Sequence, residues 1–238
     1  LYMCYTTFMP AKNSIKISVE NGYYHIYNRG VNKQKIFESP IDYSVFLRYL
    51  KDALSPAPKQ SEIEKFEVEI HGVTFTKPKR PTKNFLGEID LITYALMPNH
   101  FHLLIRQVKN GAMEAFVKSV ATRYSMYFNK SRTRVGPLFQ GVYKAVLIEN
   151  EQYLLHLSRY IHLNPQKIVK NLTDAHSSYA DYLGIKHTVW LNPHPVLDFF
   201  NNPVHPALKK VNTYKDFVEA YNSKDPTDET MLENLTLD

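Results

Sequence analysis

The residues with the most evident chemistry are two histidines separated by one hydrophobe, His100 and His102. Residues two apart on a β-strand point to the same face of a sheet. We therefore expect both imidazoles on one face, with Phe101 and Leu103 entering a core behind them. Neutral imidazole is a common ligand of divalent metals, so this spacing favours a metal site. The alternative is a strand that carries the pair by chance, since the chain has ten histidines.

The surrounding pattern predicts the elements that position this pair. Alternating or apolar runs indicate strands, the 3.6-residue period indicates helices, and Pro40, Asn150 and Pro165 are typical of helix ends. The order is strand, helix, strand, strand, helix, strand, helix, which fits an α+β sandwich of antiparallel sheet and helices. The expected strands are 23–28, 89–96, 100–106 and 142–148, and the expected helices are 41–53, 112–129 and 151–164.

Three segments lie outside this pattern. Residues 1–20 are expected to form an N-terminal arm, and 185–238 a C-terminal extension with one short helix near 214–221. Residues 54–84, rich in proline and charge, are interpreted as an insertion. Within it, two strand-like runs flank His71-Gly72, which predicts a β-hairpin.

Composition narrows the class of protein. The 238 residues carry a net charge of +6, which favours an anionic partner such as nucleic acid. The single cysteine, Cys4, excludes an intramolecular disulfide framework and a cysteine zinc site. No apolar run is long enough to span a bilayer, and the N-terminus lacks the pattern of a secretion signal. We therefore expect a cytoplasmic protein without a membrane partner.

Several short motifs occur in a fixed order around the histidine pair. They are Tyr24-His-Ile-Tyr-Asn-Arg-Gly30, Ile36-Phe37, Asp42-Tyr43, Gly136-Pro-Leu-Phe-Gln-Gly141, Arg159-Tyr-Ile-His-Leu-Asn-Pro165 and Ser177-Ser-Tyr179. The set resembles the single-tyrosine transposases of the His-hydrophobe-His (HUH) superfamily, closest to the REP-associated tyrosine transposases.

That resemblance implies a ferredoxin-like, RNA-recognition-like catalytic domain over 21–184, with an antiparallel sheet and helices on one face. It also implies a metal-dependent transposase, or nickase-ligase, that cuts and rejoins single-stranded DNA beside hairpin-containing repeats. Cutting would proceed by transesterification through a 5′-phosphotyrosine, with Mg²⁺ or Mn²⁺ polarising the phosphate. The bacterial nucleoid would be its place of action.

The resemblance assigns the nucleophile to Tyr160. Asn164 lies four residues later on the same helix face, where its amide oxygen would complete the metal site with His100 and His102. Helix capping before Pro165 is an equal alternative for Asn164, and Tyr124 and Tyr127 are rival tyrosines. We interpret His25 as structural.

The expected phosphate contacts are basic residues interleaved with aromatic ones, a combination suited to a groove for single-stranded DNA. Two other functions stay open: a catalytically silent DNA- or RNA-binding module on the same fold, and a rolling-circle replication initiator. A homodimer and a monomer are both compatible with the sequence. The candidate contacts are Arg29, Lys33, Lys35, Arg123, Arg132, Arg134 and Lys144.

Overall fold

A four-stranded antiparallel sheet forms the centre of the computed structural model, which describes residues 17–59, 63–71, 73–78, 81–201, 208, 211 and 213–220. Its strands are β1 (Gly22–Arg29), β4 (Ile89–Met97), β5 (His100–Gln107) and β6 (Lys144–Ile148), in the order β4-β5-β1-β6. Helix α1 (Pro40–Leu54) follows β1, and α2 (Ala112–Ser131) follows β5. With the inserted hairpin set aside, this βαββαβ order and strand arrangement is the ferredoxin-like fold, as expected.

Local sequence signals account for the helix ends. Pro40 begins α1, where its missing N–H costs nothing, and the Asp42 carboxylate accepts a hydrogen bond from the Ser39 N–H at 2.9 Å. Helix α3 (Glu151–Leu163) begins after Asn150, whose side chain accepts from the Tyr153 N–H at 2.8 Å. These ends lie where the sequence predicted them.

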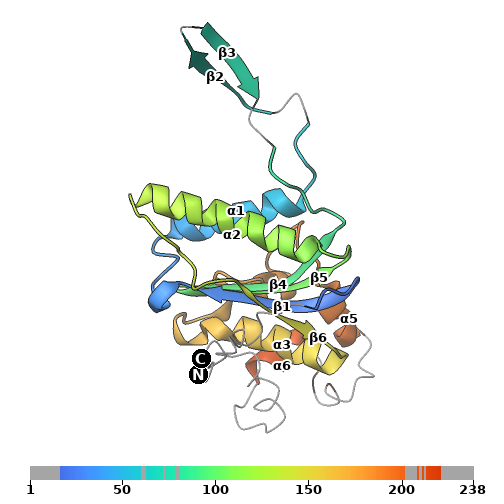
Figure 1. Cartoon of the computed structure of the whole chain (residues 1–238). Helices are drawn as coiled ribbons and strands as arrows, with labels where there is room; N and C mark the ends of the chain where they lie inside the picture. Colours follow the sequence, from blue (N-terminus) through green and yellow to red (C-terminus); the bar gives the residue numbers. More distant parts are fainter. Residues whose placement is uncertain are drawn as a thin grey trace, which may run out of the picture.

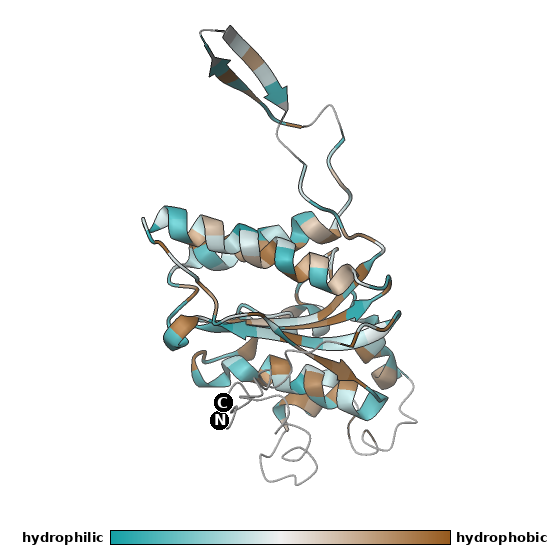
Figure 2. Ribbon diagram, viewed as in Figure 1, coloured by the Kyte–Doolittle hydropathy of each residue, from teal (hydrophilic) through white to brown (hydrophobic). Residues whose placement is uncertain are grey.

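Helices cover both faces of the sheet, which corrects the prediction of helices on one face (Figure 1). Helices α1 and α2 pack on one face and form a first core with it. Helices α3, α5 (His194–Asn201) and α6 (Tyr214–Glu219) pack on the other face and form a second core. The physical reason is that β4 and β5 contribute buried apolar residues to both cores, Phe101 and Leu103 to the first and Ala95 and Leu104 to the second, and both sets must be shielded from water. Figure 2 shows hydrophobic segments in the sheet and in the helices on either side of it.

The predicted hairpin is present in the insertion. Strands β2 (Lys65–Ile70) and β3 (Val73–Pro78) pair in antiparallel register, and His71 in the turn has a φ of 52°. The hairpin extends away from the layer of α1 and α2 (Figure 1). Two basic residues of the insertion, Lys79 and Arg80, lie outside the described residues.

Short segments complete the chain. The Ser-Ser-Tyr motif lies against the edge of β4, where the Ser178 hydroxyl accepts a hydrogen bond from the Tyr94 N–H at 2.9 Å. In the part of the chain that the structure describes, no helix is long and apolar enough to cross a membrane. The short helices are the 3₁₀ turns Val31–Lys33, Asn164–Lys167 and Leu172–Asp174, and α4 (Tyr179–Tyr182).

Candidate active site

The histidine pair lies at the start of β5 and faces α3. Leu104 belongs to the second core, whereas Phe101 and Leu103 belong to the first. Strand alternation therefore places His100 and His102 on the face that α3 covers, as the spacing predicted. Their ring centroids are 5.0 Å apart, with ring planes at 87°.

A tightly packed turn fixes the position of His100. The Pro98 carbonyl accepts hydrogen bonds from the backbone N–H groups of Ile36 (2.7 Å) and Phe37 (3.0 Å), and the Asn99 carbonyl accepts from Gly30 (2.8 Å). A Cβ on Gly30 would lie 2.2 Å from the Gln34 carbonyl oxygen, so only glycine fits. The loop after β1 thus holds the β4–β5 turn in place.

Asn164 connects the two histidines to α3. Its Oδ1 is 3.1 Å from His100 Nε2, and its Nδ2 is 3.4 Å from His102 Nε2. It lies directly after α3, and its backbone N–H donates to the Tyr160 carbonyl. Asn164 therefore lies at the end of α3 with its side-chain amide beside both histidines.

Burial keeps the histidines neutral. Desolvation lowers the pKa of His100, an effect that the Asn164 contact opposes and the Arg29 charge reinforces. Desolvation, followed by the neighbouring His25 and His100, holds the pKa of His102 well below its usual range. Near pH 7 both rings are therefore neutral, the state in which one imidazole nitrogen has a lone pair that can bind a metal.

His100 is surrounded by more hydrogen-bond acceptors than it has protons to share. A neutral imidazole has one N–H, and His100 has acceptors at both nitrogens: Asn99 Oδ1 at 2.7 Å from Nδ1 and Asn164 Oδ1 at Nε2. With that proton on Nδ1, toward Asn99, the His100 Nε2 lone pair faces the amide oxygen. Two lone pairs facing each other repel unless a cation lies between them, so this donor set fits a divalent ion.

The side chains that would bind the metal carry no negative charge. Among the described residues, no group of three or more histidine, cysteine or acidic side chains is arranged to hold a metal ion. An ion here would rely on two neutral imidazoles and one amide oxygen, leaving coordination positions for water or phosphate oxygens. The oxygen ligands in those positions would suit Mg²⁺ or Mn²⁺.

A third histidine, interpreted above as structural, belongs to the same cluster. His25 on β1 is fully buried, and its Nε2 is 2.8 Å from His102 Nδ1. Burial lowers the pKa of His25 to about 3. Strand alternation within the Tyr24–Gly30 motif puts His25 and Tyr27 on one face, but the sequence alone does not say which strand lies beside them.

Tyr160 lies over this cluster on α3. Its ring centroid is 5.5 Å from that of His102 and 6.3 Å from that of His25, edge-on to both. The rival tyrosines lie in the first core, on the opposite face of the sheet. There Tyr124 donates a hydrogen bond to the Ile36 carbonyl, and Tyr127 donates to Asp42 at 3.0 Å.

Four of the seven expected phosphate contacts lie near the histidines. In the sheet register, Arg29 is opposite His100, and Lys144 is opposite Tyr27, which is opposite His102. The loop with Lys33 and Lys35 contacts the turn, since the Lys33 carbonyl accepts from Asn99 Nδ2 at 3.3 Å. Both of these lysines are exposed.

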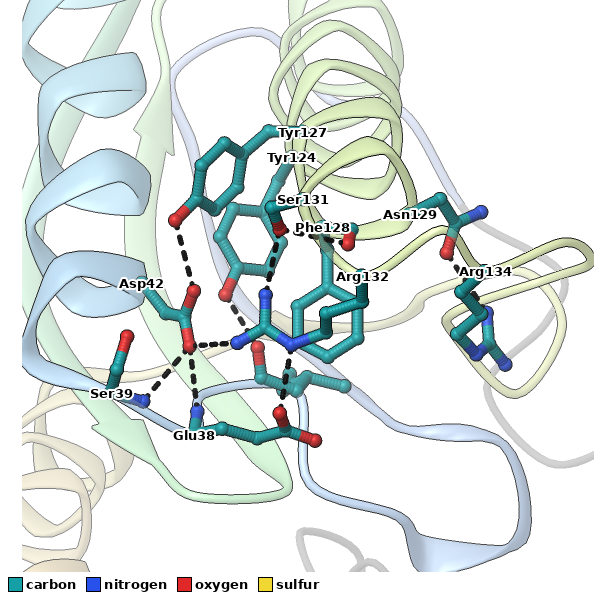
Figure 3. Close-up of polar contacts among 11 residues, drawn as sticks. Glu38, Ser39, Asp42, Tyr124, Tyr127, Phe128, Asn129, Ser131, Arg132 and Arg134 are labelled. Carbon is teal, nitrogen blue, oxygen red and sulfur yellow. Dashed lines mark hydrogen bonds and ion pairs between the residues drawn. The ribbon is translucent and has the colours of Figure 1, made fainter.

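The other three arginines have partners within the protein, outside the histidine cluster. Arg123 pairs with Asp52 at 2.8 Å, and Arg134 donates to Asn129 at 3.0 Å. Arg132 donates to Glu38 at 2.7 Å and to Asp42 at 2.6 Å (Figure 3). These contacts tie α2 and the loop after it to one another and to α1, so a structural role accounts for Arg123, Arg132 and Arg134.

The fold and the cluster define a ferredoxin-like protein whose histidine pair faces a tyrosine-bearing helix. Residues 83–164 match the family model Transposase IS200 like. This match extends from just before β4 to Asn164 and includes the histidine pair and Tyr160. Residues 83–164 are thus similar to the IS200-like transposases over the part of the chain that carries the candidate site.

Solved structures of similar proteins were also found, whereas no curated protein matches the sequence. One is the structure of a REP-associated tyrosine transposase bound to a REP hairpin, at 11% identity and a TM-score of 0.47, covering 75% of this chain and 95% of that chain. Another is the crystal structure of a protein from Deinococcus radiodurans R1 described as a transposase. It shows 12% identity and a TM-score of 0.35, covering 64% of this chain and 95% of that chain.

Proposed function

We propose that this protein is a transposase that cleaves and rejoins single-stranded DNA by metal-dependent transesterification, with Tyr160 as the nucleophile. The observation that carries the proposal is the convergence of the Nε2 atoms of His100 and His102 on the Asn164 amide, beneath the Tyr160 ring. A histidine pair, an amide and a tyrosine at one point serve the chemistry of phosphodiester exchange better than that of a packing cluster.

His100, His102 and Asn164 would hold a Mg²⁺ or Mn²⁺ ion. When bound, such an ion neutralises charge on the scissile phosphate and so stabilises the transition state. The protein's own contribution is to present unprotonated nitrogens at neutral pH, because burial lowers the pKa of both histidines. Asn164 orients its amide from the end of the same helix that carries the nucleophile.

In the cleavage step, the Tyr160 hydroxyl oxygen attacks phosphorus and displaces the 3′ oxygen of the preceding nucleotide. A bond from Tyr160 to phosphorus forms, the bond from phosphorus to the 3′ oxygen breaks, and the phenol proton is transferred overall to the leaving 3′ hydroxyl. The product is a 5′-phosphotyrosine and a free 3′ end. Because the phosphodiester energy is retained, a 3′ hydroxyl can reverse the step and join DNA without a further energy source.

The expected substrate is single-stranded DNA beside a hairpin repeat. Arg29 and Lys144 on the site face and Lys33 and Lys35 near the turn suit phosphates that approach Tyr160. The +6 net charge supports such an anionic partner. Mixing experiments decide between a monomer and a homodimer in which Tyr160 of one subunit serves the other.

The test uses a hairpin oligonucleotide with a single-stranded flank, labelled at either end and incubated with Mn²⁺. We expect a denaturing gel to show the 3′-labelled fragment bound to protein and the 5′-labelled fragment released. Tyr160→Phe should lose the adduct but keep binding DNA, whereas Tyr124→Phe and Tyr127→Phe should form it. DNA binding without any adduct from the unmodified protein would instead identify a silent binding module.

A further inference from the structure

A buried contact joins His25 to the candidate metal ligand His102 and takes no part in the cleavage step proposed above. His25 is 0% exposed, and its Nε2 approaches His102 Nδ1 at 2.8 Å. Its other nitrogen, Nδ1, is buried and has no hydrogen-bond partner among the described residues. An unpaired buried nitrogen costs stability, and an apolar side chain at this position would avoid that cost.

The contact with His25 bears on which ring nitrogen of His102 carries its single proton. To bind a metal through Nε2, which faces Asn164, His102 must keep its single proton on Nδ1. The atom 2.8 Å from Nδ1 is His25 Nε2, which must then accept that proton's hydrogen bond. His25 in turn carries its own proton on the unpaired Nδ1.

We propose that His25 is a positioning residue that selects the metal-binding tautomer of His102 and fixes the orientation of its ring. This inference rests on the proposed function, since it requires an ion bound through His102. Metal-bound histidines commonly donate their other ring N–H to a carboxylate, carbonyl or water, and removal of such a partner typically weakens metal affinity about 10–100-fold. Here a second imidazole from the neighbouring strand is the acceptor.

The sheet holds the two rings in this geometry. They lie side by side, with centroids 5.0 Å apart and planes at 16°, and β1 pairs with β5 along the whole length of both strands. Tyr27 packs against His25 from the same strand, at 4.8 Å between centroids. The acceptor is therefore in place before an ion binds, which limits the ordering that binding requires.

Two variants separate positioning from packing. His25→Phe keeps a planar ring but has no acceptor, whereas His25→Gln places an amide oxygen close to the former Nε2. We expect His25→Phe to weaken Mn²⁺ binding about 10–100-fold in calorimetric titration of the whole protein. His25→Gln should restore most of that affinity, and thermal unfolding without metal should show His25→Phe at least as stable as the unmodified protein.

The tautomer itself provides a readout that does not depend on mutation. In protein with ¹⁵N-labelled histidine and bound Mg²⁺, we expect His102 to carry its proton on Nδ1 and His25 to carry its proton on Nδ1. A His25 protonated on Nε2, or Mn²⁺ affinity unchanged in His25→Phe, would overturn the inference. If the unmodified protein binds no Mn²⁺, the proposed metal site itself fails. That result differs from the two outcomes that would overturn only the role of His25.

Discussion

Replacement of Asp42 tests whether the arginine after α2 stabilises the fold or contacts DNA. Asp42 Oδ2 accepts hydrogen bonds from the Glu38 N–H (2.8 Å), the Ser39 N–H (2.9 Å) and Arg132 Nη2 (2.6 Å), and its Oδ1 accepts from the Tyr127 hydroxyl (3.0 Å) (Figure 3). The Asp42 side chain is 1% exposed and that of Arg132 is 23% exposed. The carboxylate thus joins the start of α1 to the end of α2.

Two substitutions divide its contribution into charge and hydrogen bonding. Asp42→Asn keeps an acceptor for the N–H groups and a donor for Tyr127, so it removes mainly the charge on the bond to Arg132, worth about 1–2 kcal/mol. Asp42→Ala removes the acceptor of the Glu38 and Ser39 N–H groups and of the Tyr127 hydroxyl, although Arg132 keeps its contact with Glu38. Breaking a buried pair costs about 3–5 kcal/mol. Because Arg132 is partly exposed, we expect the lower end, about 3 kcal/mol.

Urea unfolding measures both values. With a slope of about 2–3 kcal/mol per molar urea for a protein of this size, Asp42→Ala should lower the midpoint by about 1 M, and Asp42→Asn by about 0.5 M. A midpoint for Asp42→Ala equal to that of the unmodified protein would refute the structural role. Strong loss of DNA affinity in folded Asp42→Asn would refute it as well.

The pH dependence gives the same test in another form. Burial would raise the pKa of Asp42, but the hydrogen bonds from Glu38, Arg132, Ser39 and Tyr127 outweigh it and leave the pKa lowered. The stabilisation is therefore complete above the unfolded-state pKa of about 4 and is lost as pH falls through the lower native value. The difference in unfolding free energy between the unmodified protein and Asp42→Asn should be constant above about pH 5 and shrink toward pH 3. An undiminished difference at pH 3 would contradict this assignment.

Four further predictions concern the active site. His102→Ala should abolish the covalent adduct with little change in hairpin binding, because affinity rests on many phosphate contacts; gel shift and adduct assays on the same sample decide. Asn164→Ala should weaken Mn²⁺ binding and Asn164→Asp should strengthen it, and equal affinities in calorimetry would leave Asn164 as a helix-end residue only. Removing Arg29 and Lys144 together should reduce the slope of log affinity against log salt by up to about 2, whereas an unchanged slope would place the DNA elsewhere. A mixture of His102→Ala and Tyr160→Phe should regain adduct formation if the tyrosine serves a second subunit, and should stay inactive if each subunit uses its own.

The sequence by itself determined the local elements and the face on which each candidate residue lies. Strand alternation put His100 and His102 on one face, and helical spacing put Tyr160 and Asn164 one turn apart, because these relations depend on the backbone repeat alone. The helix ends at Pro40 and Asn150 followed from capping chemistry for the same reason.

Only the tertiary structure decided which of these faces meet. His25 is 77 residues from His102 in the chain, and its role depends on β1 lying beside β5. The sequence makes Arg132 a candidate DNA contact, and only the fold places Asp42, 90 residues away, 2.6 Å from it. The helices on the second face likewise became part of the protein's core only through packing with the sheet. Periodicity fixes the direction of a side chain within its own element, but its partner depends on which distant element packs there, and that is settled by burial of the whole chain at once.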